Sequence, residues 1–94
     1  MPSKFEENLI DMIEHGQLED ALCACKKNVS LYGYHKEVAE FLNNTARRFK
    51  EKNSLNVAEK ILKTSIDIYP GHVKSYADLG FVQKDLKKLK EAYA

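Results

Sequence analysis

The chain has 94 residues, enough for one domain and too few for two. Apolar residues make up 44% of it, and only 4 Gly and 2 Pro are present, which excludes a β sandwich or barrel with many turns. The 15 Lys and Arg against 14 Asp and Glu leave a net charge of +1, so no global field concentrates nucleic acid or an anionic membrane.

The N-terminal stretch has no apolar run of signal-peptide length, and no segment approaches the roughly 20 apolar residues of a membrane span. Cys23 and Cys25 lie two positions apart in a helical pattern, so about 200° separates them around the helix and they cannot pair within it. Two unpaired thiols fit a reducing compartment. We therefore expect a cytoplasmic protein without a membrane segment.

The first two segments with helical periodicity cover about residues 3–15 and 18–31. Ser3 and Glu6 form a capping-box pattern at the start of the first segment, and Gly16 is a left-handed stop at its end. The second segment ends at Gly33. Apolar residues fall on one face of each predicted helix: Phe5, Leu9, Met12 and Ile13 in the first, and Leu18, Ala21, Leu22, Cys25 and Val29 in the second.

The third and fourth segments cover about residues 35–52 and 54–68. Asn53 is the stop between them, because asparagine tolerates the left-handed conformation, and Pro70-Gly71 ends the fourth. Their predicted buried stripes are Val38, Phe41, Leu42, Thr45 and Phe49, and then Leu55, Ala58, Ile61, Leu62, Ile66 and Tyr69.

The fifth segment starts near His72. Its predicted face consists of Val73, Tyr76, Leu79, Gly80 and Gln83. Residues 84–88 are expected to form a turn, after which a sixth helix starts at Leu89 and is cut off at residue 94. The chain is thus expected to be all-α.

One spacing occurs three times, in residues 16–21, 53–58 and 87–92. In each stretch a leucine follows the first residue by two positions and an alanine follows the leucine by three. The alanines Ala21 and Ala58 are 37 residues apart, and Ala58 and Ala92 are 34 residues apart. The second distance equals the tetratricopeptide period of about 34 residues.

At these positions the sequence resembles the tetratricopeptide repeat family. The residues that carry the resemblance are Leu42, Ala46, Phe49, Ala58, Leu62 and Pro70, followed by Tyr76, Leu79, Gly80 and Ala92. The resemblance implies a single domain, 1–94, of antiparallel helix hairpins stacked as a short right-handed α-solenoid. Its repeats would be 2–38, which is degenerate, 39–72, and 73–94, which is truncated. The small Ala46 and Gly80 would lie where paired helices approach closely.

The resemblance also implies a site, because in the family the first helix of each hairpin lines a concave surface that binds peptides. Carried onto this chain, the groove-facing candidates are Ile10, Ile13, Asn43, Arg47, Lys50, Lys74, Phe81 and Lys84. Some family members grip a terminal carboxylate with a basic and asparagine set. Asn44 and Lys74 match that set, but Asp78 and Glu6 have the wrong charge, so we do not expect a carboxylate clamp.

No motif for catalysis or cofactor binding is present. The Cys23-x-Cys25 pair with His15 or His35 lacks zinc-ligand spacing, and there is neither a phosphate loop nor a nucleophile motif. We therefore expect that the protein is not an enzyme and that it binds no metal or cofactor. The one basic patch, Lys84, Lys87, Lys88 and Lys90, has no interleaved aromatic residues for base stacking, so nucleic acid is not an expected partner.

Three functions remain open. The first is a scaffold or binding module that recruits a protein or peptide in the groove or at the open C-terminal end. The second is a domain that self-associates through that end. The third is an accessory fragment of a larger protein. The residues expected to carry self-association are Tyr76, Leu79, Leu89, Ala92 and Tyr93.

Overall fold

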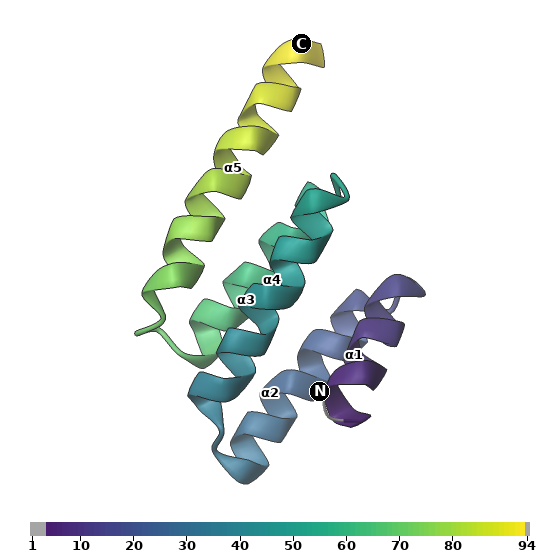
Figure 1. Cartoon of the computed structure of the whole chain (residues 1–94), viewed down its shortest axis with the longest axis vertical. Helices are drawn as coiled ribbons and strands as arrows, with labels where there is room; N and C mark the ends of the chain where they lie inside the picture. Colours follow the sequence, from purple (N-terminus) through teal and green to yellow (C-terminus); the bar gives the residue numbers. More distant parts are fainter. Residues whose placement is uncertain (1–3, 94) are drawn as a thin grey trace.

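A computed structural model describes the backbone of residues 4–93 and the side chains of residues 4–91. It contains five helices: α1 (Lys4–Glu14), α2 (Leu18–Tyr32), α3 (His35–Glu51), α4 (Leu55–Ile68) and α5 (Val73–Tyr93). No strand occurs within the described residues. The helices pack against one another into a body of 44 × 29 × 22 Å (Figure 1). The all-α prediction is confirmed.

Three of the predicted stops adopt the left-handed conformation. Gly16 has φ 82°, Gly33 has φ 77° and Asn53 has φ 65°. After two of them the next N–H reaches back five residues: Gln17 N–H donates to Met12 O and Ser54 N–H to Phe49 O, each at 2.8 Å. This pairing satisfies carbonyls that the helix end would otherwise leave open. Ser3 of the predicted capping box lies outside the described residues.

The core is centred on the pair α3 and α4, which make the most extensive contact in the molecule. Two alanines, Ala39 and Ala58, are fully buried in this pair. Their small side chains leave room for larger neighbours that are also buried, Leu42, Ile61 and Leu62. Ala46 is buried as well, as the alignment of the repeats predicts.

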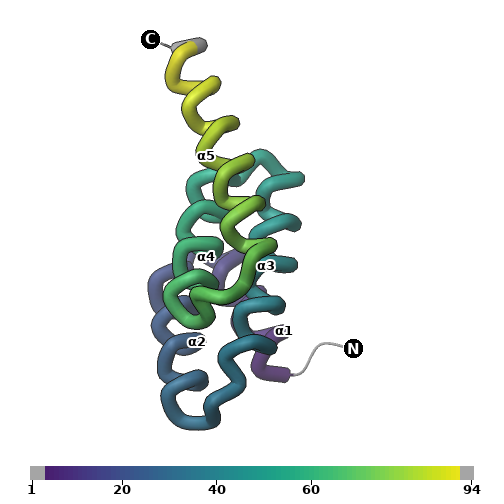
Figure 2. The backbone as a smooth tube through the Cα atoms, turned by 90° about the vertical axis from the view of Figure 1, so that its left-hand side faces the viewer, coloured from purple at the N-terminus to yellow at the C-terminus, as the bar shows by residue number. Residues whose placement is uncertain are grey.

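The N-terminal hairpin α1–α2 packs beside this pair, chiefly through α2 against α4 (Figure 2). Its own core continues the main one through Leu9, Ile13, Leu22 and Cys25. At its edge Lys60 of α4 donates a hydrogen bond to a carboxylate oxygen of Glu19 at 3.1 Å.

The last helix corrects the prediction for residues 84–88. That segment is helical, α5 runs unbroken to Tyr93, and the turn with a sixth helix starting at Leu89 is wrong. The segment has no Gly, Pro or Asn to stop a helix, and its lysines and leucine are good helix formers. Leu86 also packs against the core from within it. The end of α5 therefore projects past α3 and α4 (Figures 1 and 2).

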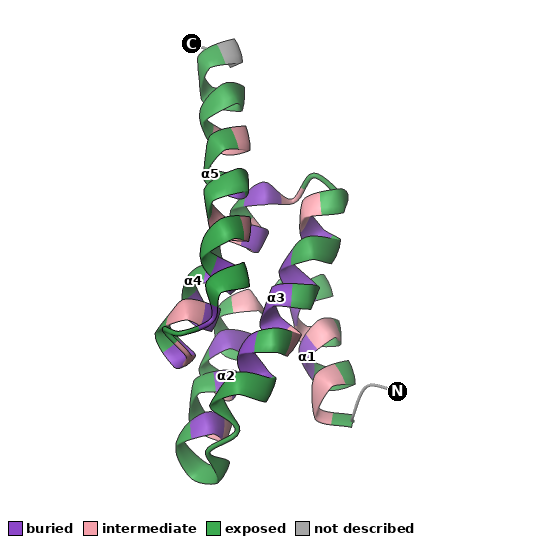
Figure 3. Cartoon of the chain, turned by 60° about the vertical axis from the view of Figure 1, so that its left-hand side comes forward, coloured by how far each residue is buried: buried purple, intermediate pink, exposed green. Residues whose placement is uncertain are grey.

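The face that α5 buries also differs from the predicted one. Residues that face the body are Ser75, Leu79, Val82 and Leu86. Of the predicted face only Leu79 packs inward, whereas Val73 is 77% exposed and Tyr76 50% exposed. Gly80 lies on the exposed side, and a Cβ added there would meet nothing within 4 Å, so it is not a point of close helix approach. Figure 3 shows this outward face of α5 exposed along its length.

Candidate functional site

A cleft runs between α3 and α5 and contains two cavities of about 340 Å³ each. We call them the Arg47 pocket and the His72 pocket. The Arg47 pocket is lined by Ala46, Arg47, Lys50, Glu51, Leu62, Asp78 and Val82. The His72 pocket is lined by Glu40, Asn43, Asn44, His72, Val73 and Lys74. On α3 the two pockets occupy neighbouring turns, and a hydrogen bond from Asn43 of the His72 pocket to Asp78 of the Arg47 pocket joins their linings.

Asp78 holds the two sides of the cleft together. Its carboxylate accepts a hydrogen bond from Asn43 Nδ2 at 2.8 Å and lies 3.8 Å from an Arg47 guanidinium nitrogen. Asn43 is buried by this contact between α3 and α5 and also lines the His72 pocket, so its predicted place in the groove stays a prediction. The negative charge of Asp78, which argues against a carboxylate clamp, lies beside the positive charge of Arg47 on the facing helix.

Phe81 lies beside the Arg47 pocket, next to Lys50, which lines it. Phe81 is 59% exposed on α5, and the Lys50 ammonium lies 5.2 Å from the centre of its ring. Such a cation–π contact keeps the aromatic ring and the positive charge side by side. Lys84 follows Phe81 by three positions, roughly one helical turn, and is exposed. Arg47 and Lys50 thus line one pocket, and Phe81 lies against Lys50.

The two groove candidates on α1, Ile10 and Ile13, lie in different environments. Ile10 lines a third cavity, of about 310 Å³, between α1 and α3. Ile13 does not face any such cavity: it is buried with Leu9 in the core, because these residues lie one helical turn apart on the inner face of α1. Its assignment to the groove is therefore corrected.

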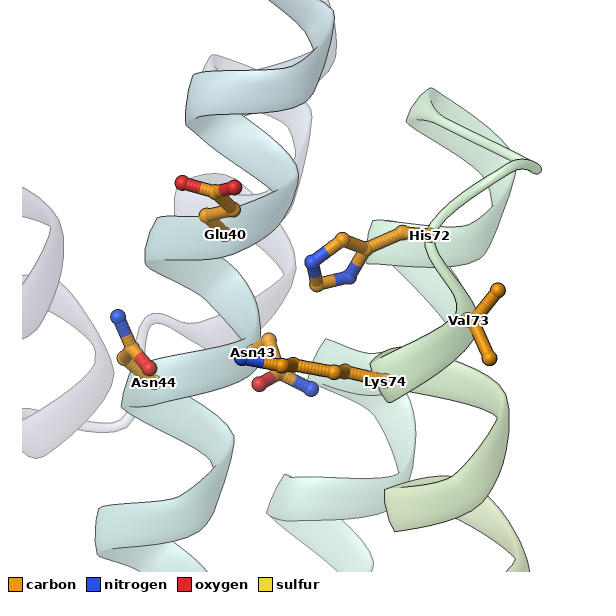
Figure 4. A pocket seen from close by; sticks show the side chains of 6 residues that line it. All are labelled: Glu40, Asn43, Asn44, His72, Val73 and Lys74. Atoms are coloured by element: carbon orange, nitrogen blue, oxygen red, sulfur yellow. The ribbon is translucent and has the colours of Figure 1, made fainter.

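The His72 pocket contains a buried polar chain that links three helices. His72 Nδ1 lies 2.6 Å from Ser75 Oγ, and Ser75 Oγ lies 2.8 Å from Ser65 Oγ. Ser65 in turn donates to the carbonyl of Ala39 at 3.0 Å. Figure 4 shows the His72 ring pointing from the start of α5 toward α3. Lys74 reaches the same way, toward Asn43, whereas Val73 points outward.

The thiols and acidic residues do not add a second chemical site. Burial raises the pKa of the Cys25 thiol to about 12, and Cys23 is exposed on the other side of α2. Within the described part of the chain no cluster of three or more His, Cys, Asp or Glu could hold a metal ion. None of the described helices has the length and apolar character needed to cross a membrane.

The residues predicted to mediate self-association lie in different environments. Tyr76 is half exposed and Leu89 is 44% exposed, whereas Leu79 packs against the core. The side chains of Ala92 and Tyr93 lie outside the described residues.

Sequence reasoning gave His72 no role in the cleft, and it considered Asp78 only as a mismatch to a carboxylate clamp. His72 reads as an ordinary residue before a helix, and its role depends on Ser65, ten positions before Ser75. The sequence did hold one signal for a polar site. Ser65 and Ser75 occupy inward positions of adjacent helices, and a buried hydroxyl requires a hydrogen-bond partner.

Comparison with known proteins returned no match among family models, curated proteins or solved structures. What the cleft does must therefore be argued from its geometry.

Proposed function

We propose that this chain is a protein-interaction module that binds an extended peptide or a partner helix in the α3–α5 cleft. The hairpins would stack in the manner of a short right-handed α-solenoid of the tetratricopeptide type, with the cleft on its concave side. The proposal is one of binding rather than catalysis. Free Cys23 and Cys25 support a cytoplasmic setting.

The observation that carries the proposal is the composition of the Arg47 pocket. Its floor is formed by core residues, Ala46, Leu62 and Val82, so a side chain that enters it is removed from water. Its charged groups are the Arg47 and Lys50 cations and the Glu51 and Asp78 carboxylates, and the exposed ring of Phe81 lies beside the pocket against Lys50. An apolar floor with a few polar groups around it is typical of binding sites, and aromatic residues and arginine are common energetic centres of interfaces.

The test uses peptides selected from a random display library on the immobilised chain, with binding measured by calorimetry. Phe81→Ala is expected to weaken binding at least about tenfold, because it removes the exposed aromatic contact. Leu31→Ala is the matched control: Leu31 is an equally exposed apolar residue on α2, outside the cleft, and its loss should leave binding unchanged. Equal binding by the wild type and Phe81→Ala would refute the cleft as the site.

A second candidate is self-association through the outward face of α5. On α3, Leu42 and Ala46 are buried in the contact with α4. The residues 34 positions later, Tyr76 and Gly80, occupy the corresponding places on α5 and are exposed. An exposed apolar face of this kind is typical of interaction surfaces. Here the occupant would be a second copy of the chain.

A further inference from the structure

His72 is a buried polar residue that lines the His72 pocket of the α3–α5 cleft. Its exposed fraction is 9%, and the loop after α4 together with the first turn of α5 holds it beside Ser75. A histidine ring has two nitrogens with different roles, and the role of one follows from the bonds made by the other. The hydrogen-bond chain in this structure determines those roles.

The protons of the chain can be placed in order. The Ala39 carbonyl only accepts, so Ser65 donates its single proton there. Ser65 Oγ can then only accept from Ser75, which uses the proton of Ser75. Ser75 Oγ must in turn accept from His72, so Nδ1 of His72 carries a hydrogen. In the neutral ring this leaves Nε2 without a hydrogen and with a free lone pair.

Nε2 faces the cleft. No hydrogen bond joins Nε2 to any other residue that the structure describes, and within the same residues no buried side-chain nitrogen or oxygen lacks a partner. Nε2 is therefore in contact with solvent, which it can reach through the cavity that His72 lines. A mostly buried acceptor with a fixed direction is thus presented to whatever occupies the His72 pocket.

The other groups around this acceptor are donors and one carboxylate. Lys74 of α5 carries an ammonium group, Asn44 of α3 carries an amide, and Glu40 of α3 carries a carboxylate. The ring of Tyr69, at the end of α4, is tilted by 51° to the His72 ring, and the two ring centres lie 6.5 Å apart. A ligand that fits Nε2 and Lys74 together must present a hydrogen-bond donor and a carbonyl or other acceptor close to each other. A peptide group in extended conformation does so at every residue except proline.

We propose that His72 Nε2 accepts a hydrogen bond from one backbone N–H of a peptide lying in the α3–α5 cleft, while Lys74 or Asn44 donates to a neighbouring peptide carbonyl. This inference rests on the proposed function and adds the chemistry of one subsite. The subsite would bind the peptide backbone, and it would not accept proline or any N-alkylated residue at that position. The Arg47 pocket, further along α3, would then receive a side chain from a later residue of the peptide.

Two substitutions separate the roles of the two ring nitrogens. The amide nitrogen of asparagine is attached at the same distance from Cβ as Nδ1, so His72→Asn keeps the donor to Ser75 and removes Nε2. His72→Gln does the reverse: it reaches the position of Nε2 with its carbonyl oxygen and loses the donor at Nδ1. We expect His72→Asn to keep the melting temperature and lose affinity, and His72→Gln to lose melting temperature and retain more of the affinity.

The decisive experiment is a double-mutant cycle with a library-selected peptide. Each backbone N–H of the peptide is replaced in turn by N-methyl. At one position methylation should weaken binding to the wild type about fivefold, the scale of one hydrogen bond, and have no effect on binding to His72→Asn. ¹⁵N spectra of the wild-type imidazole should show Nε2 unprotonated, with its signal moving when the peptide is added.

Three results would overturn the inference. The first is an Nε2–H tautomer in the free protein. The second is an Nε2 signal that does not move when the peptide binds. This result would exclude the hydrogen bond to Nε2 even if His72→Asn fails to fold. The third is an N-methyl scan with equal losses in the wild type and His72→Asn. If Phe81→Ala abolishes binding and any of these results is found, the proposed function stands and the His72 subsite alone fails. If no peptide binds the cleft, both fail.

Discussion

Cys25 shows at the level of one residue how burial controls chemistry. It packs in the core of the N-terminal hairpin, where desolvation disfavours the thiolate and raises the pKa of the thiol from 9.0 to about 12. The neighbouring Cys23, two positions away, is exposed. The two thiols of one helix therefore differ in reactivity because they lie on opposite faces.

The raised pKa makes stability depend on alkaline pH. Between pH 9.0 and about 12 the unfolded thiol ionises while the folded thiol stays protonated. The unfolded state then binds fewer protons, so the free energy of unfolding falls as pH rises, by at most about 1.4 kcal/mol per pH unit from this group. The contribution is complete below pH 9.0 and is lost as pH rises through the folded pKa.

Urea unfolding between pH 8 and pH 11 measures this effect. Cys25→Ala should show a shallower alkaline decline than the wild type, although it is less stable at every pH because it leaves a cavity. Cys23→Ala should keep the wild-type slope, since that thiol is exposed. Parallel curves for all three proteins would contradict the prediction.

Periodicity identifies buried residues well where burial is apolar and local. It predicts Leu9 and Cys25 correctly, because their burial follows from the inner face of a single helix. It does not predict that Asn43 is buried, since a polar side chain is not part of an apolar stripe. The partner that buries it, Asp78, is 35 residues away, and only the packing of α5 on α3 brings the two together.

At the level of elements, the sequence defines helix ends where a residue type enforces them. Gly16, Gly33 and Asn53 stop helices because they adopt positive φ at low cost, and all three breaks are found. Residues 84–88 contain no such residue. The turn expected there followed only from aligning repeats, and local helix propensity prevails over that alignment in the structure.

The continuity of α5 can be tested with Lys87→Pro. Proline inside a helix removes a hydrogen bond and clashes with the preceding turn, at a local cost of about 3 kcal/mol. We expect circular dichroism to show a loss of about two helical turns, because the C-terminal end of α5 would no longer be held in the helix. The melting temperature should change little, since Lys87 is exposed and lies after Leu86, the last residue of α5 that packs against the core.

Lys87→Ala is the control for loss of the lysine charge and should keep or raise the helical signal. If the wild-type Cα chemical shifts of residues 84–88 are those of a turn, the continuous helix is wrong and the original sequence prediction is restored.

At the level of the whole molecule, the outward face of α5 is the candidate surface for self-association. Val73, Tyr76 and Phe81 are exposed along one helix, and the end of that helix projects beyond its neighbours. If this face pairs with a second copy, the molar mass from sedimentation should rise with concentration. Tyr76→Glu should then shift the protein toward monomer, because it introduces a charge on the apolar face.

Tyr32→Glu is the matched control, because Tyr32 is a similarly exposed tyrosine at the far end of α2. It should leave the association unchanged. A wild-type chain that stays monomeric at high concentration excludes self-association and leaves peptide binding as the proposed function.

The unequal packing of the helices also determines how the molecule opens. Contacts are most extensive between α3 and α4 and sparse between the α1–α2 hairpin and the rest. Opening free energies in a protein follow such differences, from near zero at loosely attached segments to the global value in the core. The α1–α2 hairpin can therefore detach while α3 and α4 remain closed. Backbone amides of α1 would exchange with solvent long before those of α3, so one small domain would behave as two cooperative units of different lifetime.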